Sequence, residues 1–98
     1  MEEEVLEFFM VEDKPVQTKN VKPIYPEIAR KAGLSGRVFV RFKVGKDGRV
    51  SNVQILKGPE IFREAAIVAV SKFVFKPAMQ NDKPVAVWMS QAIKFDLH

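Results

Sequence analysis

The sequence predicts a two-layer α+β domain with an antiparallel sheet of three or four strands and two helices on one face of that sheet. Three patterns carry this prediction: an alternating strand at 37–44 before an Asp-Gly turn, a helical stripe of apolar residues over 62–73, and a second alternating strand at 85–97. The chain has 98 residues, 47% hydrophobic and 29% charged, as expected for one folded domain. A domain this small has little room for an enclosed substrate cavity.

The chain begins with an acidic leader, residues 1–20, which we separate from a main domain at 21–98. Residues 5–11 form an apolar run that predicts a short strand, and residues 12–22 predict a polar connector. Residues 1–16 carry six acids and one base, a net charge of −5, whereas residues 17–98 carry fifteen bases and six acids, a net charge of +9. An acidic segment before a basic body is found in autoinhibitory tails, but more often it is a solvated end or has no function of its own.

The segment 25–33 predicts a first helix of about two turns, with Pro26 at its first position and Gly33 just past its end. The alternating strand at 37–44 then runs into Gly45-Lys46-Asp47-Gly48, a strong signal for a hairpin. The returning strand at 50–56 does not keep one parity, which predicts a bulge near Ser51 and Asn52.

A second helix is predicted to open at Gly58-Pro59-Glu60 and to bury one stripe of side chains. Members of that stripe recur at helical spacing: Phe62, Ala65, Ala66, Ala69, Val70 and Phe73. Pro77 ends the pattern, and a turn at 81–84 leads into the last strand. In that strand Val87, Met89, Ile93, Phe95 and Leu97 are expected on one face, and Trp88, Ser90, Ala92, Lys94 and Asp96 on the other.

The composition argues against catalysis and against a metal or cofactor. The chain has no cysteine, and its single histidine is His98, so neither a thiolate metal site nor a Ser-His-Asp triad fits. Acids of the body stand at helix starts, at turns and at one strand end, where Glu27 and Glu60 complement helix dipoles and Asp47 suits a turn. We therefore expect a protein that binds rather than one that catalyses.

Three features suit nucleic acid or a partner protein. Gly33 to Gly36 matches the GxxG clamp of RNA-binding KH modules, but Gly36 runs straight into a strand, so Gly33 is better interpreted as a helix C-cap. Phe39 with Arg41 and Lys43 is a weak candidate for a stacking platform. Trp88 is expected on the face opposite the helices, either covered by the leader or a second copy, or free to anchor a partner.

From Val21 to Leu97 the chain resembles the C-terminal domain of the TonB proteins. Several motifs carry the resemblance in order and spacing: Pro23-Ile24-Tyr25-Pro26, Gly33 to Gly36, Val38 to Val44 with Asp47-Gly48-Arg49-Val50, Asn52 to Leu56, the alanine-rich helix, Phe73 to Ala78, and Ile93-Lys94-Phe95. The resemblance implies a non-enzymatic periplasmic domain of a protein anchored in the inner membrane and powered by an ExbB/ExbD-type complex. It implies TonB-dependent transport, including siderophore transport, and suggests that this chain is a domain excised from a longer protein.

The resemblance also implies a binding mode. The TonB box of an outer-membrane transporter adds as a strand beside the last strand of the domain, here 85–97. The implied site is Val87, Trp88, Met89, Ser90, Gln91, Ala92, Ile93, Lys94 and Phe95, with secondary contacts at Lys22 and Tyr25. The residue before Pro23 is often glutamine in the family, so Lys22 is a departure. An open strand edge suits this mode, because main-chain hydrogen bonds make little demand on the sequence of the peptide.

The leader strand at 5–11 is predicted to pair with an edge of the sheet, which includes the last strand as a candidate. It would then compete with the partner, or exchange between chains to give a homodimer or strand swap. Two other functions stay open: an adaptor module of another envelope or motility machine that uses the same sheet edge, and a basic nucleic-acid-binding domain.

Overall fold

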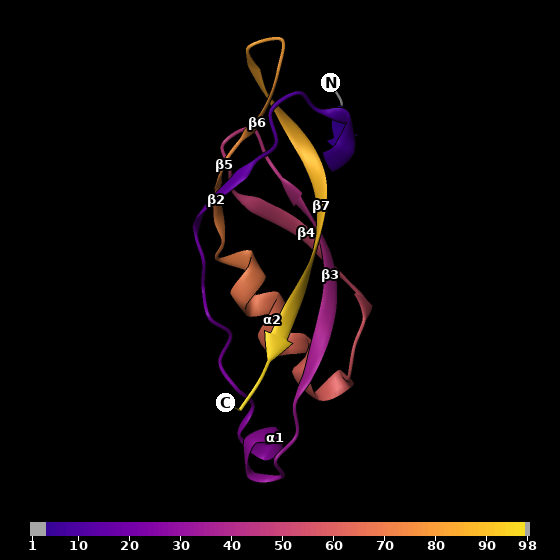
Figure 1. Ribbon diagram of the computed structural model, residues 1–98, viewed down its shortest axis with the longest axis vertical. Coiled ribbons are helices and arrows are strands. Elements are labelled where there is room, and N and C mark those ends of the chain that lie inside the picture. Colours follow the sequence, from indigo (N-terminus) through magenta and orange to yellow (C-terminus); the bar gives the residue numbers. More distant parts are fainter. Residues whose placement is uncertain (1–3, 98) are drawn as a thin grey trace.

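Two long antiparallel strands, β3 (Gly36–Val44) and β7 (Lys83–Phe95), form the centre of the fold. They pair continuously, from Gly36 opposite Phe95 to Val44 opposite Val87. The computed structural model describes residues 4–97, and the molecule measures 50 Å along these strands against 23 and 20 Å across them (Figure 1). The two strands that the alternating sequence pattern predicts thus lie along the long axis of the molecule.

Strand β4 (Val50–Lys57) returns beside β3 through the Gly45 to Gly48 turn. Asp47 makes this turn as predicted, since its carboxylate accepts a hydrogen bond from the N–H of Arg49 at 3.0 Å. The predicted bulge is confirmed: the register shifts between the pairs Arg41–Gln54 and Lys43–Ser51, and Asn52 has a φ of 51°. The extra residue turns the β4 strand relative to β3.

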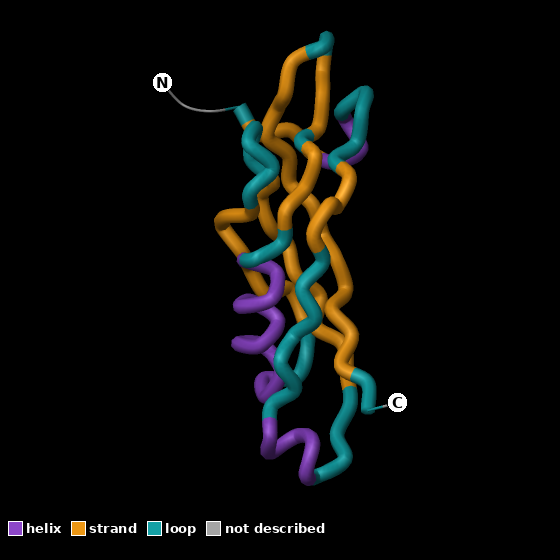
Figure 2. The backbone as a smooth tube through the Cα atoms, turned by 90° about the vertical axis from the view of Figure 1, so that its left-hand side faces the viewer, coloured by secondary structure: helices purple, strands orange, loops and turns teal. Residues whose placement is uncertain are grey.

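The two helices are α1 (Glu27–Lys31) and α2 (Glu60–Ser71), and Pro26 and Pro59 occupy their N-cap positions. Helix α1 is shorter than the predicted helix, which begins at Pro26 and ends before Gly33, and Pro26 is its N-cap rather than its first residue. Its end is the predicted C-cap, because Gly33 has a φ of 69° and the N–H groups of Gly33 and Leu34 return to the carbonyls of Arg30 and Ala29. Figure 2 shows α1 at one end of the molecule and α2 along the sheet.

The core lies between α2 and the sheet. The predicted stripe of α2 is buried at Phe62, Ala66, Ala69 and Val70, with Ala65 half-buried. The Phe62 ring stacks on the Phe95 ring of β7 with centroids 4.5 Å apart. Valines and Phe42 from the inner face of β3 complete this core, and Val11 of the leader is buried in it as well.

The α+β class is confirmed, but the sheet differs from the prediction of three or four antiparallel strands. It has five strands and is mixed, because β1 (Val5–Glu7) lies parallel to β7, while β6 (Ala78–Gln80) forms a hairpin with the start of β7. A separate two-stranded sheet joins β2 (Val16–Lys19), inside the predicted connector, to β5 (Val74–Lys76). Such short strands form through their long-range partners and leave no periodic pattern in the sequence.

Two strand boundaries also move. The predicted strand at 5–11 ends at Glu7 and continues as a 3₁₀ helix, η1 (Phe8–Met10). The last strand spans Lys83–Phe95 rather than 85–97, because Asn81 and Asp82 both adopt positive φ angles and fold a two-residue turn directly before Lys83. Among residues 4–97, no helix has the length and apolar character needed to cross a membrane.

Candidate strand-docking edge of β7

Strand β7 has one edge covered by β3 and one edge that is mostly open. On the outer edge, away from β3, β1 pairs only with Ala86–Trp88. In the part of the chain that the structure describes, no strand pairs with this outer edge between Met89 and Phe95. An uncovered edge presents backbone N–H and C=O groups to any extended peptide.

The backbone groups at this edge can be assigned from the hairpin. Gly45 donates its N–H to the carbonyl of Arg49 at 2.9 Å, so its backbone points toward β4. Successive residues of a strand direct these groups to opposite edges, so even-numbered residues of β3 direct theirs toward β7. Their partners in register are the odd-numbered residues of β7. The outward residues are therefore Trp88, Ser90, Ala92 and Lys94.

Burial confirms the predicted faces of β7. Val87, Ile93 and Phe95 are buried and Met89 is half-buried, whereas Ser90, Ala92 and Lys94 are exposed. Leu97 and Asp96 lie beyond the strand and are exposed, so they do not extend either face. Consequently a docked strand would contact the side chains of Ser90, Ala92 and Lys94 on one side and the connector on the other.

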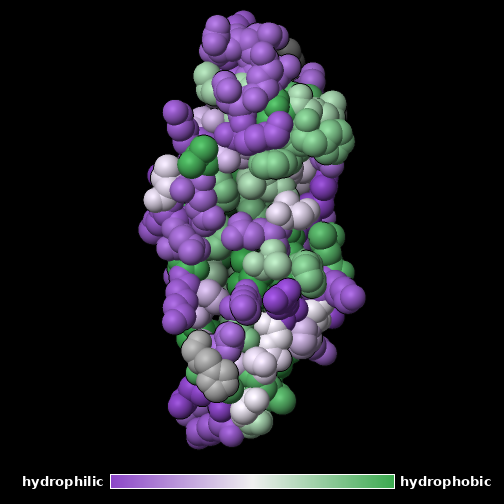
Figure 3. Space-filling model, in the orientation of Figure 1, coloured by the Kyte–Doolittle hydropathy of each residue, from purple (hydrophilic) through white to green (hydrophobic). Residues whose placement is uncertain are grey.

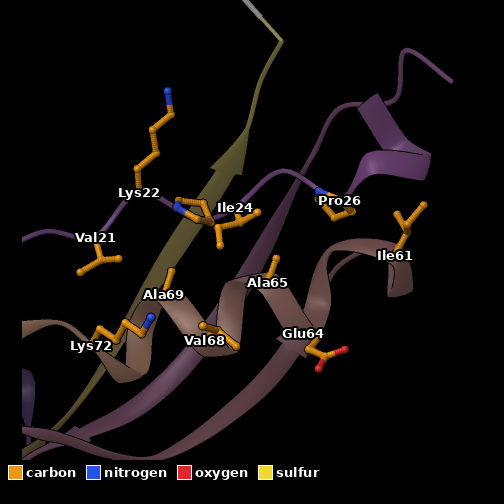
Figure 4. Close-up of a pocket in the computed structure, with 11 residues that line it drawn as sticks. Val21, Lys22, Ile24, Pro26, Ile61, Glu64, Ala65, Val68, Ala69 and Lys72 are labelled. Carbon is orange, nitrogen blue, oxygen red and sulfur yellow. The ribbon is translucent and has the colours of Figure 1, made fainter. Parts of the chain in front are cut away.

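Lys22 lies beside the open edge. A cavity of about 320 Å³ separates the connector from β7 and is lined by Asn20 to Pro23, Phe73 and Gln91 to Lys94. Val21 and Ile24 point toward α2, where a second hollow of about 420 Å³ remains against Ala65, Val68 and Ala69. The Lys22 side chain extends away from that helix (Figure 4). The structure thus brings Lys22 together with the open half of the predicted site.

Tyr25, the other predicted secondary contact, packs against the core beside β7. Its ring packs edge-on against Phe62 and Phe95, with centroids 5.6 and 5.9 Å apart, and its hydroxyl donates a hydrogen bond to the carbonyl oxygen of Leu34. The ring is half-buried and touches the core. Tyr25 therefore supports the inner face of β7 and positions the site indirectly.

Trp88 sits where the leader meets the sheet. It is half-buried on the outer face, and the Arg41 guanidinium carbon lies 4.9 Å from the centre of its ring. Glu7 at the end of β1 binds the same arginine, with both carboxylate oxygens 2.9 to 3.0 Å from Nη2. Trp88 therefore lies under Arg41 and opposite the end of the leader strand, so the leader contributes to its partial burial.

The predicted pairing of the leader with the last strand is confirmed by the register of β1 on β7, Val5 opposite Ala86, Leu6 opposite Val87 and Glu7 opposite Trp88. The Glu7–Arg41 ion pair could not be predicted from the sequence, because no local pattern links opposite charges that are 34 residues apart. Next to it, η1 exposes Phe8, Phe9 and Met10, and hydrophobic surface gathers at this end of the molecule (Figure 3).

Acidic side chains are spread over the described part of the chain. Residues 4–97 contain no cluster of three or more His, Asp or Glu side chains that could hold a metal ion. Glu27 forms ion pairs within its own helix, with Arg30 at 4.0 Å and Lys31 at 3.3 Å, as expected of a helix start.

Comparisons with known proteins agree with this geometry. Residues 21–97 match the family model for the Gram-negative bacterial TonB protein C-terminal. Protein TonB2 of Pseudomonas aeruginosa is 37% identical over 81 residues, 81% of this chain and 30% of that protein. Protein TonB of Vibrio cholerae is 33% identical over 88 residues, 87% of this chain and 36% of that protein.

The chain thus spans about a third of the length of these curated relatives. The solution NMR structure of the Pseudomonas aeruginosa TonB CTD superposes with a TM-score of 0.73 at 28% identity, covering 86% of this chain and 87% of that one. Fold, sequence motifs and an open last strand all point the same way: this chain belongs to the TonB C-terminal domain family of Gram-negative bacteria, a family without enzymatic activity.

Proposed function

We propose that this chain is the periplasmic domain of a TonB-type energy transducer and that it captures the TonB box of an outer-membrane transporter by strand addition on β7. One observation carries the proposal: the outer edge of β7 has no strand partner between Met89 and Phe95 in the described chain, and its outward backbone groups belong to Ser90, Ala92 and Lys94. Membership of the family supports the same role.

The proposed complex is held mainly by the main chain. An extended peptide beside β7 would exchange N–H···O=C bonds with the three outward residues, and its alternate side chains would face the cavity beside Lys22. One added strand gives a small interface, below about 1,200 Å², so the affinity is modest. Modest affinity suits a coupling that must form and release repeatedly.

The same geometry supports force transmission. A peptide in the sheet is joined to β7, and β7 is joined to β3 over nine consecutive residue pairs, from Gly36–Phe95 to Val44–Val87. A pull along the strands is therefore shared among many hydrogen bonds. We propose that the pull comes from an ExbB/ExbD-type complex in the inner membrane, which would act through the part of the protein that precedes this domain.

Lys22 tunes the recognition. Its side chain extends away from α2 on the connector beside Ala92 and Lys94, so two cations border the cavity where the incoming strand would lie. Lys94 also forms an ion pair with Asp96 at 4.0 Å, so an acidic side chain on the peptide would gain chiefly from Lys22, at the modest strength of solvent-exposed pairs. Tyr25 contributes only by holding Phe95 and the inner face of β7.

A peptide titration tests the proposal. Synthetic TonB-box peptides from the transporters of the same organism are titrated into the full chain by calorimetry. A matched peptide carries N-methyl groups on alternate backbone nitrogens, which keeps every side chain but removes the main-chain donors. We expect saturable binding of the first peptide and none of the second. Equal binding of both peptides would refute strand addition, and no binding at millimolar peptide would refute the function.

A further inference from the structure

We infer that β1 is a tethered occupant of the docking edge, which an incoming strand must displace to pair along the whole of β7. The inference rests on the proposed function, because it concerns the regulation of the same edge. Strand β1 pairs with Ala86–Trp88 on the outer edge, in line with the open segment Met89–Phe95. The edge is thus divided into a short segment that the chain fills itself and a longer one that it leaves open.

The filled segment is held by a latch of three side chains: Glu7 on β1, Arg41 on β3 and Trp88 on β7. Arg41 binds both carboxylate oxygens of Glu7 and stacks over the Trp88 ring, so the leader is tied to two strands of the main sheet at once. Both partners of this ion pair keep about a third of their side-chain surface exposed, 31% for Arg41 and 36% for Glu7. A partly exposed pair is strong enough to hold a strand and weak enough to release it.

The rest of the leader determines how much of it can detach from the sheet. Directly after Glu7 the chain turns into η1, where Phe8 and Phe9 lie beside Met89 and Ser90 around a cavity of about 340 Å³. Phe9 is 77% exposed, whereas Val11 two residues later is buried in the core. The detachable segment is therefore β1 with η1, and Val11 fixes the leader beyond it.

Displacement of β1 would replace one set of main-chain hydrogen bonds to β7 by a similar set from the incoming strand. The leaving strand is an acid-bearing apolar segment, Glu4-Val5-Leu6-Glu7, and its backbone groups return to water while those of the incoming strand leave it. The net gain for a long peptide is therefore smaller than its number of main-chain bonds indicates. The leader raises the threshold for capture and rejects weak or short-lived strands along this segment.

A reversible cross-link tests the inference on the full chain. Val5 and Ala86 are partners across β1 and β7, where neighbouring strands lie about 4.8 Å apart, within the Cα separation of a disulfide. The chain has no cysteine, so V5C/A86C forms one defined bridge that a reductant opens. Two box peptides are titrated into the oxidised and reduced forms: a long one that spans Ala86–Phe95 and a short one that spans only Ser90–Phe95.

We expect the long peptide to bind about tenfold more weakly to the oxidised form than to the reduced form. The cross-link keeps β1 in place, so the peptide cannot form about two of its main-chain hydrogen bonds to β7. The short peptide should bind both forms equally. Equal affinity of the long peptide for both forms would overturn the inference while leaving strand addition intact. Binding of neither peptide to either form would contradict the proposed function, and the inference with it.

A second variant avoids any change to buried residues. E7Q removes the charge that Arg41 holds, and E4Q removes the same charge from an exposed residue just before β1. We expect E7Q to bind the long peptide about two- to fivefold more tightly than the parent chain, with E4Q unchanged. Identical affinities of E7Q and E4Q would show that Glu7 does not latch the strand.

Discussion

The backbone N–H of Phe75 donates a 2.9 Å hydrogen bond to the carbonyl oxygen of Gly48, which ties the β3–β4 hairpin to β5. Gly48 has a φ of 80°, and a Cβ atom on it would overlap the Phe75 carbonyl oxygen. G48A should therefore lower the free energy of unfolding by about 3 kcal/mol or more, through left-handed strain and a backbone clash together.

Gly33 offers the matched control for this prediction. It also has a positive φ, 69°, but a Cβ atom there meets nothing within 4 Å. G33A should lose only the conformational term, about 1–2 kcal/mol. Urea denaturation of both variants measures the difference, and equal losses would show that the close approach of Phe75 is unimportant.

The sequence predicts the centre of this fold and the leader strand, and misses the other short strands, for one physical reason. Strands β3 and β7 and helix α2 are long enough for their apolar residues to repeat with a clear period. The period alone therefore predicts that Val38, Phe42 and Phe62 are buried. Strands β2, β5 and β6 have three or four residues each and form because other segments of the chain pair with them. Their pairing, such as Val16 with Lys76, is a tertiary contact without a periodic signal.

The candidate site divides in the same way. The alternation of β7 predicts its inner and outer side chains, and Lys22 lies at the cavity beside Ala92. The role of Tyr25 depends on the hydrogen bond from its hydroxyl to the Leu34 carbonyl oxygen. No local sequence pattern specifies this hydrogen bond. For the same reason, only the structure reveals that Trp88 lies under Arg41.

Tyr25 should matter for stability and not for the peptide contact itself. Y25F keeps the ring between Phe62 and Phe95 but removes the hydroxyl that donates to Leu34. We expect a loss of about 0.5–1.5 kcal/mol in unfolding free energy. The affinity for a box peptide should stay within about twofold of the parent chain, as expected for a residue that makes no direct contact. A larger loss of affinity at unchanged stability would mark Tyr25 as a direct contact.

Proline substitution should distinguish the two edges of β7. A92P removes an N–H that points outward, so the fold should persist while peptide binding falls below detection. Q91P removes an N–H that bonds to β3, so the domain should unfold or lose several kcal/mol, about 3 or more. Circular dichroism and calorimetry on both variants give the answer. Retained binding by folded A92P would contradict the assignment of the outer edge.

Lys22 should control the electrostatic part of binding. K22A removes a charge beside the docking cavity, and K46A removes the same charge from the turn before β4. With an acidic box peptide, K22A should bind about two- to fivefold more weakly and show a smaller dependence on salt, whereas K46A should behave as the parent chain does. Titrations at low and moderate ionic strength measure both effects. Indistinguishable variants would remove Lys22 from the contact.

Amide hydrogen exchange, read residue by residue by NMR with and without a saturating box peptide, tests strand addition most directly. The account predicts that the N–H groups of Ser90, Ala92 and Lys94 exchange fast in the free chain and become protected when the peptide binds. Those of Met89, Gln91 and Ile93, which face β3, should be protected in both states. Saturation of the peptide without new protection at Ser90, Ala92 and Lys94 would contradict docking on this edge.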